Sequence, residues 1–148
     1  MGEAGQTIFS IRAFIAGYLG PGAWKFFLVM LGGSLGAASR YGVCLMAVRM
    51  WGTSFPWGTL IVNLAGCFII GLLFALAEHA KILTPNTRLF LITGYLGALT
   101  TFSSFSAETL TLGLDGAPLS LAANMILNNV GGMGLALLGM WAGRVNLG

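Results

Sequence analysis

Four long apolar segments, each with one charge or none, dominate this 148-residue chain. Residues 26–48 contain one charge, Arg40, whereas residues 50–77, 89–107 and 116–143 contain none. A helix needs about 20 mostly apolar residues to cross the hydrocarbon core of a bilayer, and each segment reaches or nearly reaches that length. We therefore predict an all-α membrane protein whose four transmembrane helices lie near residues 26–49, 57–78, 86–110 and 117–143.

The composition excludes several other classes of protein. Hydrophobic residues make up 57% of the chain and charged residues 7%, whereas an average soluble chain carries roughly 25% charged residues. The seven basic residues are scattered and form no patch for nucleic acid. No nucleophile, base and orienting group occur together, so we do not expect an enzyme. Cys44 and Cys67 lie in apolar runs and are predicted to be small buried side chains.

The first 25 residues differ from the remainder of the chain. Residues 1–25 are predicted to form an N-terminal extension, and residues 26–148 a single membrane domain. Apolar residues at helical spacing within residues 7–19 indicate a short helix at the membrane interface, with a poorly ordered tail as the alternative. An even number of spans places both termini on one side, together with five basic residues: Arg12, Lys25, Lys81, Arg88 and Arg144. The positive-inside rule then predicts cytoplasmic termini.

Polar side chains within the spans are few, and such groups are costly in lipid unless they mark a pathway or a tight interface. They are mainly amides and hydroxyls: Thr59, Asn63, the run 100–106, Asn124, Asn128 and Asn129. No acidic residue lies in the middle of a span, and Glu108 lies near the end of the third. A proton-coupled pump or a cation channel usually needs embedded carboxylates or carbonyl cages. Hydrogen-bond donors instead favour an anion.

Several of these polar residues leave two interpretations open. Thr59 and Asn63 are four residues apart and share one helix face. Asn63 can donate two hydrogen bonds to an anion, or it can form an interhelical hydrogen bond. Arg40 can extend to the membrane interface or hold a vestibule positive and attract anions.

The third span is predicted to contain a break. Residues 94–102 include two glycines and a pair of β-branched threonines, which makes a continuous helix poor. Backbone carbonyls freed there could coordinate a small cation, whereas threonine hydroxyls bonded to the carbonyl four residues earlier are the alternative. Phe102 and Phe105 follow at helical spacing. They face lipid or the core, or they turn positive ring edges toward a desolvated anion.

Glycine is abundant, with 23 residues, and two pairs have GxxxG spacing: Gly32 with Gly36, and Gly139 with Gly143. Small residues at this spacing let membrane helices approach closely. We predict that these glycines serve helix packing.

Three motifs together resemble a known family, the Fluc (CrcB-like) fluoride channels. They are GGSLGAASRY at residues 32–41, PWGTLIVNLAG at 56–66 and GYLGALTTFSSFSAE at 94–108. The resemblance runs from about residue 26 to 143. It implies an antiparallel, dual-topology homodimer with two pores in the cell inner (plasma) membrane. Its activity would be passive, selective export of fluoride, with the lipid bilayer and a second copy as partners and no nucleic acid.

The resemblance also implies roles for individual residues. Asn63, Phe102 and Phe105 match the fluoride pore, with Thr59, Ser103 and Ser106 beside them. Arg40 matches the vestibule arginine. Gly97 and Thr100 match the residues whose carbonyls, two from each subunit, hold one structural sodium ion (Na⁺) at the dimer axis. The pore residues of the fourth helix are not assigned.

Two other classes of membrane protein are alternatives to a channel. A small multidrug exporter needs a carboxylate in its first helix, where this chain has Arg40. A non-transporting scaffold would use its glycines and amides only to join helices. The excess of positive charge on one side also leaves two assemblies open: a homodimer with a weak bias, or a pair of different chains.

Overall fold

The computed structural model describes residues 22–78 and 83–145, together with residues 10, 13, 14, 17 and 20. The interfacial helix predicted within residues 7–19 falls largely outside the described residues. All regular structure in the described part is helical. The elements are α2 (Ala23–Trp51), α3 (Trp57–Glu78), α4 (Pro85–Arg88), η1 (Leu89–Leu96), α5 (Gly97–Leu99), α6 (Phe102–Leu114), α7 (Pro118–Ile126), η2 (Leu127–Gly131) and α8 (Gly132–Val145).

These elements form four helices that are long and apolar enough to cross a membrane, which confirms the predicted number of spans. They cover Ala23–Trp51, Trp57–Glu78, Pro85–Leu114 and Pro118–Val145. Each begins or ends within a few residues of its predicted limits. Pro85 and Pro118 are the first residues of their helices, where the fixed φ of proline fits and its missing N–H costs nothing. The wider π-helical turns of η1 and η2 were not predicted.

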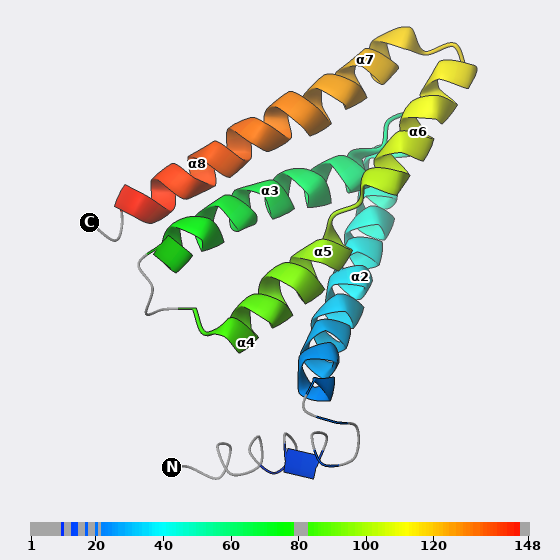
Figure 1. Ribbon diagram of the computed structural model, residues 1–148. Coiled ribbons are helices and arrows are strands. Elements are labelled where there is room, and N and C mark those ends of the chain that lie inside the picture. The colour runs from blue at the N-terminus through cyan, green and yellow to red at the C-terminus, as the bar shows by residue number, and fades with distance from the viewer. Residues whose placement is uncertain are drawn as a thin grey trace.

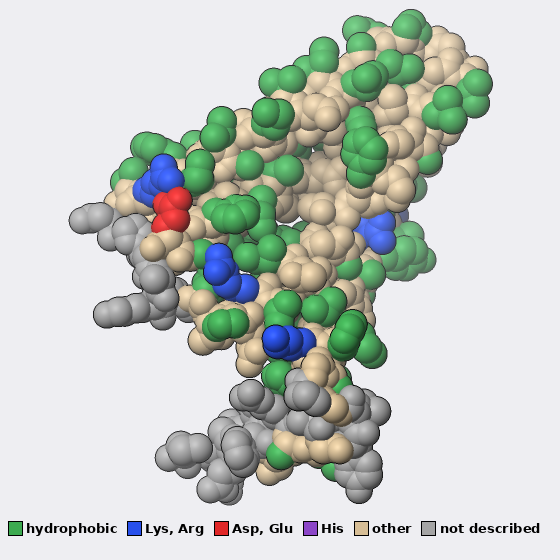
Figure 2. Space-filling view, viewed as in Figure 1, with side chains coloured by type: hydrophobic (Ala, Val, Ile, Leu, Met, Phe, Trp, Pro, Cys, Tyr) green, Lys and Arg blue, Asp and Glu red, His purple; other side chains and the backbone are tan. Residues whose placement is uncertain are grey.

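The ends of the spans gather at two ends of the molecule (Figure 1). The start of α2, the end of α3, α4 and the end of α8 lie toward one end, and the α2–α3 and α6–α7 connections lie toward the other. Basic side chains lie over the start of α2, over α4 and at the end of α8 (Figure 2). At that same end, Arg144 forms an exposed ion pair with Glu78 at 2.9 Å. The start of the first span and the end of the fourth therefore lie toward the same end of the molecule, as expected for an even number of spans.

Glycines set how closely the helices approach, as predicted. A Cβ built on Gly36 would overlap the carbonyl oxygen of Tyr95, and one built on Gly32 would overlap that of Phe90. This GxxxG pair thus seats α2 directly on the backbone of η1. The second pair works in the same way, because a Cβ on Gly139 would overlap the carbonyl of Phe68 in α3. Close backbone packing substitutes for the hydrophobic effect, which does not drive helix association in lipid.

We expect Gly36→Ala to lower the midpoint of thermal unfolding in detergent. The new methyl group must push α2 away from η1, because it meets backbone atoms that cannot rotate aside. Gly42→Ala in the same helix is the matched control, since no atom lies within 4 Å of a Cβ there. There alanine should stabilise the helix by up to about 1 kcal/mol. Equal midpoints for the two variants would contradict this packing.

Candidate functional site

The site is built around the break in the third span, which the structure confirms. α5 ends at Leu99, and α6 begins at Phe102. Between them, Thr100 (φ −82°, ψ 152°) and Thr101 (φ −151°, ψ 116°) are extended. The Thr101 hydroxyl caps α6 by accepting a hydrogen bond from the backbone N–H of Ser104 at 3.2 Å. The Thr100 hydroxyl donates to the carbonyl of Leu96, four residues earlier, at 3.0 Å. The hydroxyl–carbonyl bond and the break are therefore both present.

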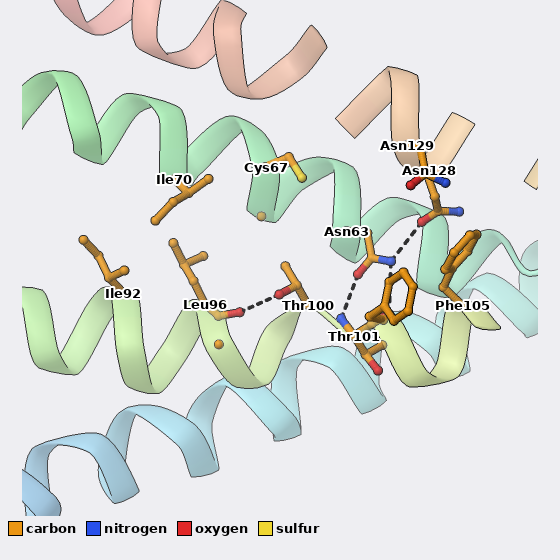
Figure 3. Close-up of a pocket in the computed structure, with 13 residues that line it drawn as sticks. Asn63, Cys67, Ile70, Ile92, Leu96, Thr100, Thr101, Phe105, Asn128 and Asn129 are labelled. Atoms are coloured by element: carbon orange, nitrogen blue, oxygen red, sulfur yellow. Dashed lines mark hydrogen bonds between the residues drawn. The ribbon is translucent and has the colours of Figure 1, made fainter. Parts of the chain in front are cut away.

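Asn63 of α3 fastens the break through its side-chain amide (Figure 3). Its Oδ1 accepts the backbone N–H of Thr101 at 2.8 Å. Its Nδ2 donates to the carbonyl of Thr101 at 3.3 Å and to Oδ1 of Asn128 at 2.9 Å. The amide thus supplies both partners that the extended Thr101 backbone needs at membrane depth, where unpaired groups are costly. Asn63 therefore forms interhelical hydrogen bonds, which is one of its two predicted roles.

These bonds divert two donors from the carbonyls of Gly97 and Thr100. In a continuous helix, the N–H of Thr101 would bond to Gly97, and that of Ser104 would bond to Thr100. Here the first donates to Asn63 and the second to the Thr101 hydroxyl. Gly97 is also exposed, and an added Cβ would meet nothing closer than the Ile92 carbonyl at 3.7 Å. Carbonyl oxygens released in this way fit a hard monovalent cation.

A cavity of about 390 Å³ lies beside the break. Its lining is free of charged side chains and combines amides, hydroxyls, aromatic rings and aliphatic groups: Asn63, Gly66, Cys67, Ile70, Ile92, Leu96, Gly97, Thr100, Thr101, Phe102, Phe105, Asn128 and Asn129. Five residues singled out from the sequence therefore meet at one place: Asn63, Gly97, Thr100, Phe102 and Phe105.

The two phenylalanines lie on the first turn of α6, with their ring centroids 5.5 Å apart and the rings tilted by 52°. Phe105 is only 7% exposed, whereas Phe102 is 75% exposed in the single chain. The buried Phe105 ring lines the cavity from within the chain. The exposed ring extends the cavity toward the outside of the chain, where a partner or lipid must cover it.

Thr59 lies one helical turn before Asn63 but does not line this cavity. Its buried hydroxyl donates to Oε1 of Glu108 on α6 at 2.6 Å. This pair lines a second cavity, of about 460 Å³, near the α2–α3 and α6–α7 connections, and Asp115 also lines it. Glu108, near the end of the third span, thus bonds to Thr59, which lies 49 positions earlier in the chain. Helical spacing alone could not indicate this pair.

The remaining predicted residues lie outside the first cavity in the single chain. Ser103 and Ser106 are exposed on α6. The Ser106 hydroxyl donates to the carbonyl of Phe102 at 2.9 Å, and Ser103 pairs with the Thr101 hydroxyl at 3.2 Å. Arg40 is half-buried in α2 and forms no ion pair within the described residues.

The role of Asn124 and Asn128 in this site was not assigned from the sequence. Nδ2 of Asn128 donates to the backbone carbonyl of Asn124 at 3.1 Å and to its Oδ1 at 2.9 Å. Asn124 is fully buried and donates to the Thr109 hydroxyl at 2.9 Å. The signal for this network was present: two asparagines four residues apart on one face of an apolar helix.

The fold and the site define a multi-pass helical membrane protein. Beside its broken helix lies an uncharged, largely apolar cavity that contains amide and hydroxyl groups. The chain belongs to the CrcB-like family, since the family model described as "CrcB-like protein, Camphor Resistance (CrcB)" matches residues 27–140. It is 46% identical over 111 residues to a protein of Legionella pneumophila (strain Paris), covering 75% of this chain and 83% of the relative. That relative is named "Fluoride-specific ion channel FluC".

Relatives in other bacteria carry the same name. The protein of Shewanella sp. (strain ANA-3) is 46% identical over 101 residues, covering 68% of this chain and 81% of the relative. That of Aeromonas salmonicida (strain A449) is 43% identical over 117 residues, covering 79% and 92%. These relatives are ion channels by name, which confirms the predicted family and the prediction that the chain is not an enzyme.

Proposed function

We propose that this protein is a fluoride-selective channel that lets fluoride leave the cell passively. The observation that carries the proposal is the cavity beside the break, which has donors and aromatic rings but no charged side chain in its lining. Relatives at 43–46% identity that are named fluoride-specific ion channels support the choice of ion.

The chemistry of the cavity suits a small, strongly hydrated anion. Asn63 brings amide hydrogens, one of them in a long bond of 3.3 Å, and Thr101 brings a hydroxyl. The edges of aromatic rings are positive, so Phe102 and Phe105 can face an anion without binding it tightly. Weak contacts of this kind replace part of the hydration shell and still let the ion leave, as conduction requires.

The proposed working unit is an antiparallel homodimer with two pores. Support comes from the open side of the single chain, where Gly97 is exposed and the Phe102 ring is 75% exposed. Both adjoin the cavity, so a second copy placed there would complete its wall. Ser103 and Ser106, exposed on the same helix, would then lie beside the completed path.

We also propose that a structural sodium ion is bound at the dimer axis. The carbonyls of Gly97 and Thr100 would hold it, two from each copy, because both have lost their helical donors at the break. When bound, the ion would neutralise carbonyl dipoles that otherwise face one another across the axis.

Export would need no energy source beyond the membrane potential. Neutral hydrogen fluoride enters an acidified cell and dissociates inside, and the negative interior then drives the anion outward. That drive is about 2.3 kcal/mol per elementary charge for each 100 mV. The half-buried Arg40 would keep a vestibule positive and attract anions. The proposed location is the cell inner membrane. In the antiparallel dimer, one copy would have cytoplasmic termini and the other would have its termini on the opposite side.

The proposal is tested by growth in fluoride. A bacterium that lacks its own fluoride exporter should grow in millimolar fluoride when it produces this chain. It should fail to grow when it produces an equal amount of the Asn63→Ala variant in its membrane. Continued growth inhibition with abundant wild-type protein would contradict the proposed function.

Phe102→Ala is expected to slow fluoride efflux about tenfold, which is the size of effect that one aromatic contact provides. Folding should change little, because the ring is largely exposed in the single chain. Leu110→Ala is the matched control, since Leu110 is 65% exposed on the same helix but does not line the cavity. Efflux per dimer from liposomes gives the comparison. Equal rates for the two variants would remove Phe102 from the ion path.

A further inference from the structure

A hydrogen-bonded chain of side chains runs from the break to the helix that carries Phe105. It begins at Asn63, whose Nδ2 donates to Asn128, and Asn128 donates in turn to Asn124. Asn124 donates to the Thr109 hydroxyl, which donates to the backbone carbonyl of Phe105 at 2.7 Å. The chain therefore links α3, the fourth span and α6, and it connects the cavity amide with the cavity ring.

The direction of this chain is fixed by backbone groups. A backbone N–H can only donate, so the N–H of Thr101 requires Oδ1 of Asn63 to face it. Nδ2 of Asn63 must then face Asn128. At the other side, the backbone carbonyl of Asn124 can only accept, so Nδ2 of Asn128 must point to it. With both amides set in this way, the Oδ1 of Asn128 has to accept from Asn63.

Both hydrogens of the Asn63 amide are consequently engaged, but unequally. One makes a 2.9 Å bond to Asn128, and the other makes a 3.3 Å bond to the carbonyl of Thr101. The second lies beyond the usual N–H···O range of 2.7–3.2 Å and is the weaker of the two. An anion at Asn63 must take one of these hydrogens from its present acceptor. The Asn63 hydrogen that bonds to the Thr101 carbonyl costs less to release.

We propose that Asn128 is a positioning residue of the ion path. It holds one hydrogen of Asn63, so that the other hydrogen is presented to the passing anion. Asn128 itself is anchored by two bonds to Asn124, whose side chain is 0% exposed. The inference rests on the proposed function for the presence of an anion in the cavity. The contact between the two amides does not depend on that function.

The neighbouring Asn129 provides a matched contrast. It also lines the cavity, but its amide donates only to the carbonyl of Met125 in its own helix, at 2.8 Å. A residue that acted only by lining the cavity would behave like Asn129. A residue that acts through Asn63 would change the state of the Asn63 amide when it is replaced.

The test combines side-chain amide spectra with transport. The protein, labelled with [¹⁵N]asparagine in lipid nanodiscs, has six asparagines, whose NH₂ signals are assigned by single substitutions. Asn128→Leu should move the Asn63 signals and speed their hydrogen exchange about tenfold, which corresponds to one lost hydrogen bond. In liposomes it should slow fluoride efflux about tenfold and lower the ratio of fluoride to chloride flux. Asn129→Leu should leave the Asn63 signals and their exchange rate unchanged, because the Asn129 amide bonds within its own helix.

Asn128→Asp keeps a side-chain oxygen for Asn63 and removes both donors to Asn124. It should preserve the slow exchange of the Asn63 hydrogens that Asn128→Leu loses, and it carries the spectral test if the leucine variant does not fold. Unchanged Asn63 signals in Asn128→Leu would overturn the proposal, as would wild-type flux and selectivity in that variant. Silent wild-type liposomes would contradict the proposed function, whereas shifted Asn63 signals would still support the contact.

Discussion

Asn63→Ala is expected to reduce fluoride efflux at least about a hundredfold. The change removes the donors proposed for the ion and also leaves the N–H and carbonyl of Thr101 without their partner. Each buried polar group left unpaired costs about 1–3 kcal/mol, so two such losses cost about 2–6 kcal/mol, a range that includes the roughly 2.7 kcal/mol that a hundredfold change represents. Efflux from liposomes with a known number of folded dimers measures the effect.

Two companion variants separate the causes. Asn63→Asp keeps an oxygen for the N–H of Thr101 but has no amide hydrogens, so it should fold better than Asn63→Ala and still fail to conduct. Asn129→Ala changes another asparagine of the same cavity whose bond stays within its own helix, and it should retain most of the efflux. Fluoride efflux from Asn63→Ala within threefold of the wild-type rate would show that the ion does not depend on this amide.

Gly97→Val is expected to convert the dimer into a folded monomer and to abolish efflux. Within a single chain the new side chain has room, because its Cβ would lie 3.7 Å from the nearest carbonyl, that of Ile92. Gly36 differs, since the chain's own packing excludes a Cβ there. A loss of the dimer in a chain that keeps its helical content would therefore point to a contact made outside the chain. Light scattering of the purified protein gives the number of copies, and circular dichroism reports the helical content.

The matched control is Gly134→Val on α8. That glycine is also exposed, and no atom lies within 4 Å of an added Cβ, but it does not line the cavity. This variant should remain dimeric and conduct. A Gly97→Val dimer that survives and conducts would contradict the placement of Gly97 at the dimer axis.

The spans and the break could be predicted because their signals are local. Uncharged apolar runs of sufficient length allow few alternatives to membrane helices. Two glycines followed by two threonines weaken a helix at one defined point, and the chain is extended at Thr100 and Thr101. The GxxxG pairs were likewise readable, because close backbone approach requires small residues at that spacing.

The hydrogen bonds of the site could not be predicted in the same way, because they join residues far apart in the sequence. Asn63 and Thr101 are separated by 38 positions, and Asn63 and Asn128 by 65. Which of several acceptors an amide uses depends on how α3 packs beside the break. Residue spacing and composition do not indicate that packing. The same reason explains why Thr59, on the predicted face with Asn63, instead bonds to Glu108.

The most direct test of the account is fluoride efflux from liposomes that contain the purified protein. A fluoride electrode follows the release, with chloride-loaded liposomes measured in parallel and Asn63→Ala as the inactive reference. The account predicts fast fluoride efflux with little chloride efflux, and the loss of the fluoride signal in the variant. Liposomes that stay silent although they contain folded wild-type dimer, or that release chloride as readily as fluoride, would contradict it.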